Sequence, residues 1–99
     1  MIITTVTPRG LEVSFDVESL DAANAAEVKA TLKGLDLQGQ SHVVLNLQKV
    51  EFIDSSGIGA ILSFYKEMEH RVSLRHPSPT VLSVLELLRL HTIFEIESE

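Results

Sequence analysis

The apolar residues of the chain recur with two different spacings, which predict strands and helices in turn. Residues 2–6 are all β-branched and predict a strand. Leu11, Val13 and Phe15 then alternate with polar residues, which is typical of a half-buried strand. Between the two, residues 8–10 (Pro-Arg-Gly) predict a turn. We therefore expect the chain to open with a β-hairpin.

Helical spacing begins after this hairpin. Apolar residues at positions 25, 28, 32 and 35 share one helix face, and Asp21 is a candidate cap for that helix. Residues 43–47 are nearly all apolar, as expected of a short strand that is covered on both faces. A strongly amphipathic helix is predicted after residue 54, with an apolar stripe formed by Ile58, Ile61, Leu62, Tyr65 and Met68.

The last third of the chain predicts a strand, a helix and a final strand. Residues 72–74 form the first of these strands. Ser78 and Pro79 predict the helix start, because the serine accepts a bond from a free N–H and the proline has no N–H to leave unpaired. A final strand is indicated by the apolar residues within positions 93–96.

The predicted order is two strands followed by alternating helices and strands. This order indicates an α/β fold with an N-terminal hairpin and a mainly parallel or mixed sheet, on which the helices pack. In such sheets the functional loops follow the carboxyl ends of the strands. The loops around Asp21, Ser55 and Ser78 should therefore lie along one edge of the molecule.

Composition narrows the possible functions. The chain has 99 residues, which is the size of one domain, and we expect residues 1–99 to form a single unit. Its net charge of −6 does not favour binding to nucleic acid or to an anionic membrane. With no cysteine, it can form neither disulfides nor thiolate metal sites. We find no membrane-inserting segment and no signal peptide, and expect a cytoplasmic protein.

The segment Asp54-Ser55-Ser56-Gly57 carries the candidate chemistry. It lies between a predicted strand and the amphipathic helix, so its hydroxyls are candidates for capping free helix N–H groups. A helix N-terminus also tolerates a phosphate, because it offers N–H donors and partial positive charge. Both interpretations stay open on local chemistry alone. A phosphate here would act by colliding with, or repelling, an acidic partner surface.

Enzymatic functions find little support in the sequence. The Gly57-Ile58-Gly59 segment lacks the third glycine of a dinucleotide-binding loop, and the chain has no Walker sequence and no esterase elbow. The four histidines (His42, His70, His76 and His91) show neither metal-ligand spacing nor a pattern that ties one of them to Ser55. We therefore expect no enzyme activity, no metal and no cofactor.

Three blocks of the chain resemble the STAS domain, and in particular the bacterial anti-sigma factor antagonists. The most specific block is residues 43–47 followed by 50–59, which includes the Asp-Ser-Ser-Gly segment. Residues 19–25 resemble the start of the family's first helix. Residues 74–81 and 85–87 resemble its third helix region. Because the blocks occur in the same order and with compatible spacing, the resemblance extends over nearly the whole chain.

The resemblance implies a switch protein. An unphosphorylated antagonist binds an ATP-using serine kinase that is also an anti-sigma factor, and this frees a sigma factor. Phosphorylation by the kinase releases the antagonist, and a metal-dependent serine phosphatase resets it. By position, the phosphorylated residue would be Ser55, with Ser56 as the cap and a secondary candidate. The partner-binding set would comprise Asp21, Asn24, Asp54, Ser56, Gly57 and Ile58.

The chain departs from the family pattern at two helix ends. The turn at residues 69–71 lacks the usual pair of glycines and looks shortened, while Arg89 stands where a glycine usually ends the third helix. A left-handed cap is costly for arginine, so we expect this helix to end differently or to run on. Two further functions stay open: an accessory subunit of an ABC-type lipid transport complex, and a scaffold piece of a signalling assembly.

Overall fold

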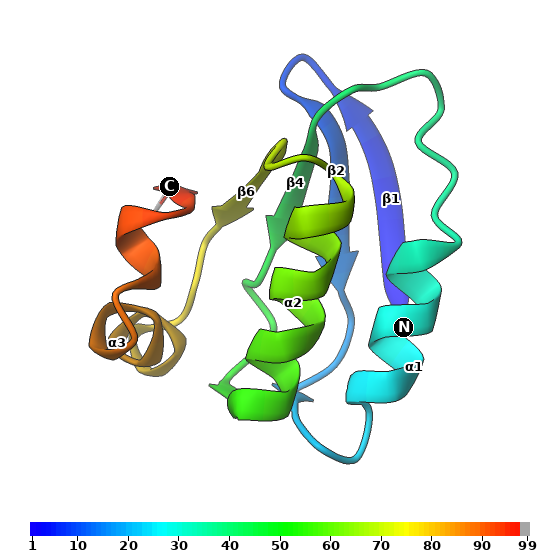
Figure 1. The fold of residues 1–99 in the computed structure, drawn as a ribbon. Helices are drawn as coiled ribbons and strands as arrows, with labels where there is room; N and C mark the ends of the chain where they lie inside the picture. The colour runs from blue at the N-terminus through cyan, green and yellow to red at the C-terminus, as the bar shows by residue number, and fades with distance from the viewer. Residues whose placement is uncertain (98–99) are drawn as a thin grey trace.

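The computed structural model describes residues 1–97 and contains a five-stranded mixed sheet (Figure 1). Its strand order is β1-β2-β4-β6-β7, and the small strands β3 and β5 form a separate parallel pair. β1 is antiparallel to β2, and every other neighbouring pair in the large sheet is parallel. The strands are β1 (Ile2–Thr7), β2 (Gly10–Phe15), β3 (Ser19–Leu20), β4 (Val43–Asn46), β5 (Phe52–Ile53), β6 (Val72–Arg75) and β7 (Glu95–Glu97). The predicted hairpin and α/β class are confirmed.

Three α-helices share one core with this sheet. α1 (Ala25–Lys33) and α2 (Ser55–Glu67) lie in front of the sheet in Figure 1, and α3 (Pro79–Leu87) lies at the lower left, at the end of the segment that follows β6. A 3₁₀ helix (Leu90–Thr92) follows α3. The core residues on the helices include Val28, Leu32, Ile58, Ile61, Phe64, Val81 and Leu85. None of the helices within residues 1–97 is long and apolar enough to cross a membrane.

The two faces of the sheet are covered by different means. The face toward the helices is apolar, and Val13, Leu45 and Leu74 lie in register across β2, β4 and β6. Val44 points to the other face, since it pairs with Glu12 and Ser73, yet it is only 1% exposed. The residues on this second face bond with one another, as in Arg75–Glu12 at 2.9 Å, Asn46–Glu12 at 3.0 Å, His42–Ser73 at 3.1 Å and Arg9–Glu97 at 2.7 Å. The predicted two-sided cover of residues 43–47 is therefore real, but one side of it is polar.

Several predicted boundaries need correction. Asn24, not Asp21, is the residue before α1, because the chain first makes a separate turn in which the Asp21 carbonyl accepts bonds from residues 24 and 25. The last strand is confined to 95–97, because the amides of Ile93 and Phe94 still bond back to the Leu90 carbonyl in the 3₁₀ turn. In α2 the buried stripe includes Phe64, whereas Leu62 and Tyr65 are half-buried. Strands β3 and β5 are too short to show a sequence period.

Residues other than glycine occupy the left-handed positions at both unusual helix ends. Arg89 has φ 60° and ψ 25°, so α3 ends after Leu87 with the conformation that glycine would take. The expectation that this helix ends differently or runs on is therefore wrong. The turn after α2 likewise uses Glu69 and His70 at φ 54° and 72°. His70 stacks on Tyr65 with the ring centroids 4.6 Å apart, a contact that favours this strained turn.

The left-handed Arg89 generates a stability prediction. Arg89→Gly should raise the free energy of unfolding by up to about 1 kcal/mol, because glycine adopts this conformation without a steric penalty. Glu86→Gly, at an exposed position inside α3, is the matched control and should lower it by about 1 kcal/mol. Urea unfolding of both variants measures the two shifts. Destabilisation by both would show that Arg89 contributes more through its side chain than it costs in backbone strain.

Candidate functional site

Two loops meet at the end of the sheet where β2 and β4 finish. The loop of β3 continues into α1 and the loop of β5 continues into α2, and the β3–β5 pairing holds them side by side. The Asp54 amide donates to the Leu20 carbonyl at 3.1 Å, which extends this pairing by one residue. The starts of all three helices lie at this lower end of the view in Figure 1. The expectation that the loops around Asp21, Ser55 and Ser78 share an edge is confirmed.

Asp54 is the residue that organises the α2 start. One of its carboxylate oxygens accepts from the amides of Ser56 at 2.8 Å and Gly57 at 3.1 Å. Its other oxygen accepts from the Ala22 amide, in the neighbouring loop, at 3.2 Å. Asp54 therefore caps α2 and ties it to the β3–α1 loop. The prediction of Ser56 as the cap is wrong. Asp54 is the residue before the helix, and its carboxylate already accepts from the amides of Ser56 and Gly57.

With the capping done by Asp54, both serine hydroxyls are left at the surface. Ser55 and Ser56 are the first two residues of α2 and are exposed, and neither hydroxyl has a hydrogen-bond partner within residues 1–97. The Ser55 amide is the first N–H of the helix, which the α-helical pattern leaves unpaired. The accessible hydroxyl oxygen of Ser55 thus lies at the positive end of a 13-residue helix.

Asp21 and Asn24 use their polar atoms inside their own loop. The Asp21 carboxylate accepts from the Ser19 hydroxyl at 2.9 Å and from the Ala23 amide at 3.0 Å. The Asn24 side chain accepts from the Asp21 amide at 3.0 Å and donates to the Ser19 carbonyl at 2.8 Å. These bonds fix the loop and leave Ala22 and Ala23 as its exposed tip. Alanine carries no sequence signal for a contact role, so pattern reading could not single these two residues out.

Gly57 and Ile58 support the loop from below. A Cβ atom at Gly57 would lie 2.2 Å from the Leu20 carbonyl oxygen, so only glycine allows α2 to approach β3 this closely. Ile58 is 6% exposed and belongs to the core. Asp54, Gly57 and Ile58 therefore hold the exposed serines in place, and Asp21 and Asn24 hold the exposed Ala22–Ala23 tip.

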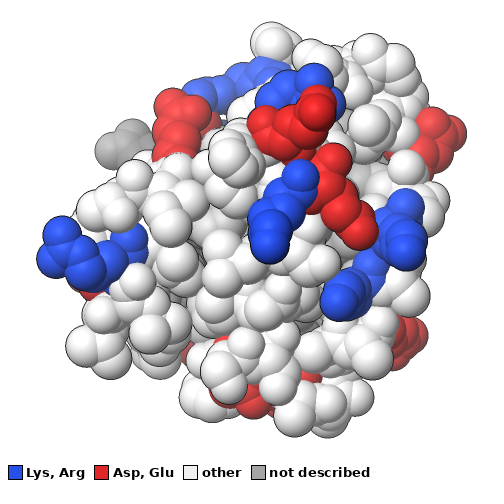
Figure 2. All heavy atoms as spheres, in the orientation of Figure 1, with Lys and Arg blue, Asp and Glu red and all other residues white. Residues whose placement is uncertain are grey.

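The edge around these loops is acidic. Glu18 and Asp21 flank one strand of the β3–β5 pair, and Glu51 and Asp54 flank the other, with no lysine or arginine in residues 17–24 or 50–57. In Figure 2 acidic side chains appear along the lower end of the molecule, while the basic ones lie higher and to the sides. This end of the molecule therefore has a negative electrostatic potential.

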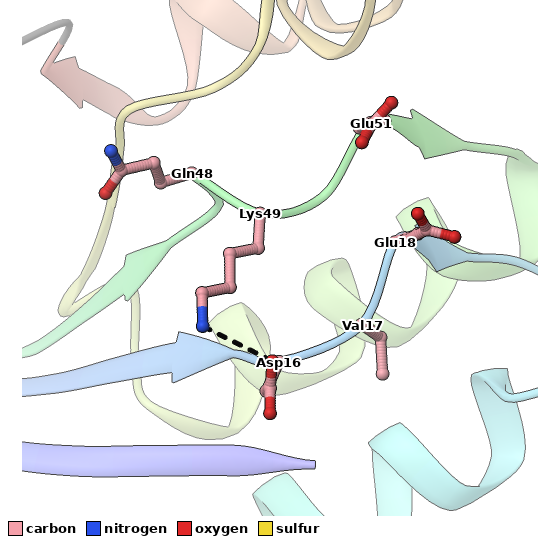
Figure 3. A pocket seen from close by; sticks show the side chains of 6 residues that line it. All are labelled: Asp16, Val17, Glu18, Gln48, Lys49 and Glu51. Carbon is pink, nitrogen blue, oxygen red and sulfur yellow. Dashed lines mark hydrogen bonds and ion pairs between the residues drawn. The ribbon is translucent and has the colours of Figure 1, made fainter.

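A shallow hollow of about 330 Å³ opens between the segments that lead into β3 and β5. Figure 3 shows its lining residues, which come from the segments after β2 and β4: Asp16, Val17, Glu18, Gln48, Lys49 and Glu51. Lys49 pairs with Asp16 at 3.4 Å, and the Glu51 amide donates to the Glu18 carbonyl at 2.7 Å. The two glutamates are exposed and leave the hollow with net negative charge. Its negative charge suits a basic group.

Fold and site together define a small α/β domain that presents a serine at a capped helix start. The chain belongs to the STAS domain family, whose model matches residues 2–99. This agrees with the resemblance in the Asp-Ser-Ser-Gly segment and with the mixed five-stranded sheet.

The relatives include anti-sigma factor antagonists. The chain is 32% identical over 71 residues to the anti-sigma F factor antagonist of Lysinibacillus sphaericus. The aligned residues cover 68% of this chain and 61% of that protein. It thus spans less than two thirds of this curated relative. The unphosphorylated form of SpoIIAA, a Bacillus cell fate determinant, matches with a TM-score of 0.74 and 25% identity over 97% of this chain and 87% of that one. Its phosphorylated form gives a TM-score of 0.66.

An antagonist from Mycobacterium paratuberculosis has the same fold. It matches with a TM-score of 0.85 and 17% identity, over all of this chain and 86% of that one. At this identity the likeness concerns the fold alone.

The double role of Asp54 generates a prediction with two separable parts. Asp54→Ala should lower the free energy of unfolding by about 1–2 kcal/mol, because it leaves two amides of α2 uncapped. Asp54→Asn should cost only a few tenths of a kcal/mol as a cap, since asparagine keeps one carbonyl oxygen. The asparagine NH₂ cannot accept from Ala22, however, so that amide should exchange faster with solvent.

Urea unfolding and amide exchange by NMR measure the two parts. An Asp54→Asn variant with an unchanged Ala22 exchange rate would show that the bond between the loops does not restrain Ala22.

Proposed function

We propose that the chain is an anti-sigma factor antagonist whose binding is controlled by phosphorylation of Ser55. The observation that carries the proposal is the exposed Ser55 hydroxyl at the start of α2, on an edge that Asp54 holds in shape. When unphosphorylated, the protein binds an anti-sigma factor through this edge and so frees a sigma factor. The 32% identical relative named as an anti-sigma F factor antagonist supports this assignment.

The partner is an anti-sigma factor that is also an ATP-binding serine kinase, and a metal-dependent serine phosphatase reverses its action. The existence of SpoIIAA in both phosphorylated and unphosphorylated forms supports this cycle. The kinase transfers the γ-phosphoryl group of ATP to the Ser55 oxygen, which loses its proton, and ADP leaves. The proposed kinase uses ATP, so we place the protein in the cytoplasm, where ATP is available.

The contact surface consists of the serine loop, the Ala22–Ala23 tip and the acidic hollow. Asp21, Asn24 and Asp54 hold this surface through their internal bonds, and Gly57 and Ile58 seat it on the core. Ser56 lies beside Ser55 on the exposed surface and is the secondary phosphorylation candidate. Because these elements are already bonded to one another, the partner meets a preformed surface and little ordering is needed on binding.

We expect phosphorylation to release the partner by steric exclusion at Ser55 rather than by electrostatic repulsion. The edge is acidic before modification, so its partner surface is basic, and the roughly −1.5 to −2 charges of a phosphate would not repel such a surface. The phosphate instead fills the space into which the partner packs at Ser55. The unpaired Ser55 amide and the positive end of α2 hold it there at little cost to the fold.

The accessory-subunit and scaffold alternatives have less support. Both need the fold and an exposed loop but no phosphorylatable serine. The 32% identical relative is named as an anti-sigma F factor antagonist. Ser55 is also exposed, as a kinase substrate requires.

The first prediction concerns the site of modification. Protein isolated from its own cells should carry one phosphate on Ser55, as measured by intact mass with fragmentation. Ser55→Ala should stay unmodified and keep its partner bound, while the matched variant Ser56→Ala should still be phosphorylated. Both substitutions should leave urea unfolding nearly unchanged, because neither hydroxyl caps the helix. Protein that carries no phosphate under any growth condition would contradict the proposal.

A second prediction separates volume from charge at Ser55. Ser55→Gln adds volume without charge, and Ser55→Asp adds charge with less volume. We expect both to weaken binding of the kinase anti-sigma factor at least tenfold, with a factor for Ser55→Asp that is no larger at about 50 mM than at about 500 mM salt. Binding by Ser55→Gln at the unmodified affinity, with Ser55→Asp weakened mainly at low salt, would show that release is electrostatic.

A further inference from the structure

The outer edge of the large sheet is unusually open. β1 is the last strand in the order β1-β2-β4-β6-β7, and four of its six residues are exposed. Ile3 is 56% exposed and Val6 is 49% exposed. The strand reads Ile-Ile-Thr-Thr-Val-Thr, without charge, proline or glycine, in a chain of which 22% is charged. Edge strands that stay single are usually protected by one of these features.

The alternation of hydrogen-bonded pairs between β1 and β2 shows which backbone N–H and C=O groups of β1 face away from the sheet. The Asp16 amide donates to the Met1 carbonyl at 2.7 Å, so residues 1 and 16 form a hydrogen-bonded pair of the antiparallel ladder. Such pairs alternate along a ladder, so Ile2, Thr4 and Val6 direct their N–H and C=O groups away from β2. The Leu11 amide donates to His42 on the other side of β2, which agrees with this alternation.

We propose that β1 is a self-association edge and that its partner is β1 of a second copy, in antiparallel pairing about Thr4. A two-fold axis perpendicular to the sheet at Thr4 pairs Thr4 with its own copy and Ile2 with Val6 of that copy. All the outward groups of these three residues are then used, in about six backbone bonds. A register centred on Thr5 would use only about four.

The side chains favour the same register. Ile2, Thr4 and Val6 pair in the hairpin with Phe15, Val13 and Leu11, so they lie on the helix side of the sheet. Ile2 already packs at the margin of the core, whereas Val6 is exposed. Pairing about Thr4 sets each exposed Val6 beside the Ile2 of the other copy, and so extends both cores. The two chains form one continuous ten-stranded sheet.

The net charge of the chain determines how association of the two copies depends on salt concentration. Each chain carries −6, so the two copies repel each other at long range while the uncharged edges attract at contact. Raising the salt concentration should therefore strengthen the association. This dependence is opposite to that expected for a partner held by ion pairs.

The experiment is sedimentation equilibrium of the full chain over a concentration series, with variants at Thr4. The wild type should show a reversible monomer–dimer equilibrium that shifts toward dimer between about 50 mM and about 500 mM salt. Thr4→Pro should weaken it at least tenfold, because proline removes an outward N–H that β2 does not use. Thr4→Lys should do the same by placing two like charges opposite each other.

Thr4→Val is the matched control and should dimerise as well as the wild type does. Circular dichroism melts of all the variants identify any that fail to fold, and Thr4→Lys keeps the test valid if Thr4→Pro is one of them. A wild type that stays monomeric up to about 1 mM overturns the proposal. So does a dimer that a folded Thr4→Lys protein leaves intact.

Discussion

The close approach of α2 to β3 is the constraint on which the site depends. Gly57 leaves no room for a side chain against the Leu20 carbonyl, and Asp54 bonds across the same junction to Ala22. Together they fix where α2 begins relative to the small β3–β5 sheet. The serines that follow Asp54 are thus presented on a rigid base, although they make few contacts themselves. A surface held in this way can be modified without disturbing the core beneath it.

Much of this arrangement could be predicted from sequence patterns, because the relevant signals are local. The alternation in β2, the apolar run of β4 and the serine–proline start of α3 all report the nearest residues of the chain. The shared edge of the three loops followed from the parallel topology. The Asp-Ser-Ser-Gly segment stands out by its position between a strand and a helix, whereas the choice of Ser55 within it comes from the family resemblance.

What the sequence could not supply depends on contacts between distant segments. The cap of α2 was misassigned to Ser56, because only the three-dimensional junction shows that Asp54 satisfies two amides at once. The roles of Asp21 and Asn24 within their loop, and the exposure of Ala22 and Ala23, depend on bonds over the β3–α1 turn. At Arg89 a general preference for glycine was overridden, since the neighbouring 3₁₀ helix and its buried Leu90 require the chain to turn there.

The polar network behind the sheet also bears on how the molecule opens. Arg9 in the first hairpin bonds to Glu97 in the last strand, a pair separated by 88 positions in sequence. Forming this contact closes a loop of nearly the whole chain, which makes it entropically costly early in folding. Contacts of this kind set how long the native state persists more than how fast it is reached. The first hairpin and the last strand are thus joined across the polar face of the sheet, although the two lie at opposite ends of the chain.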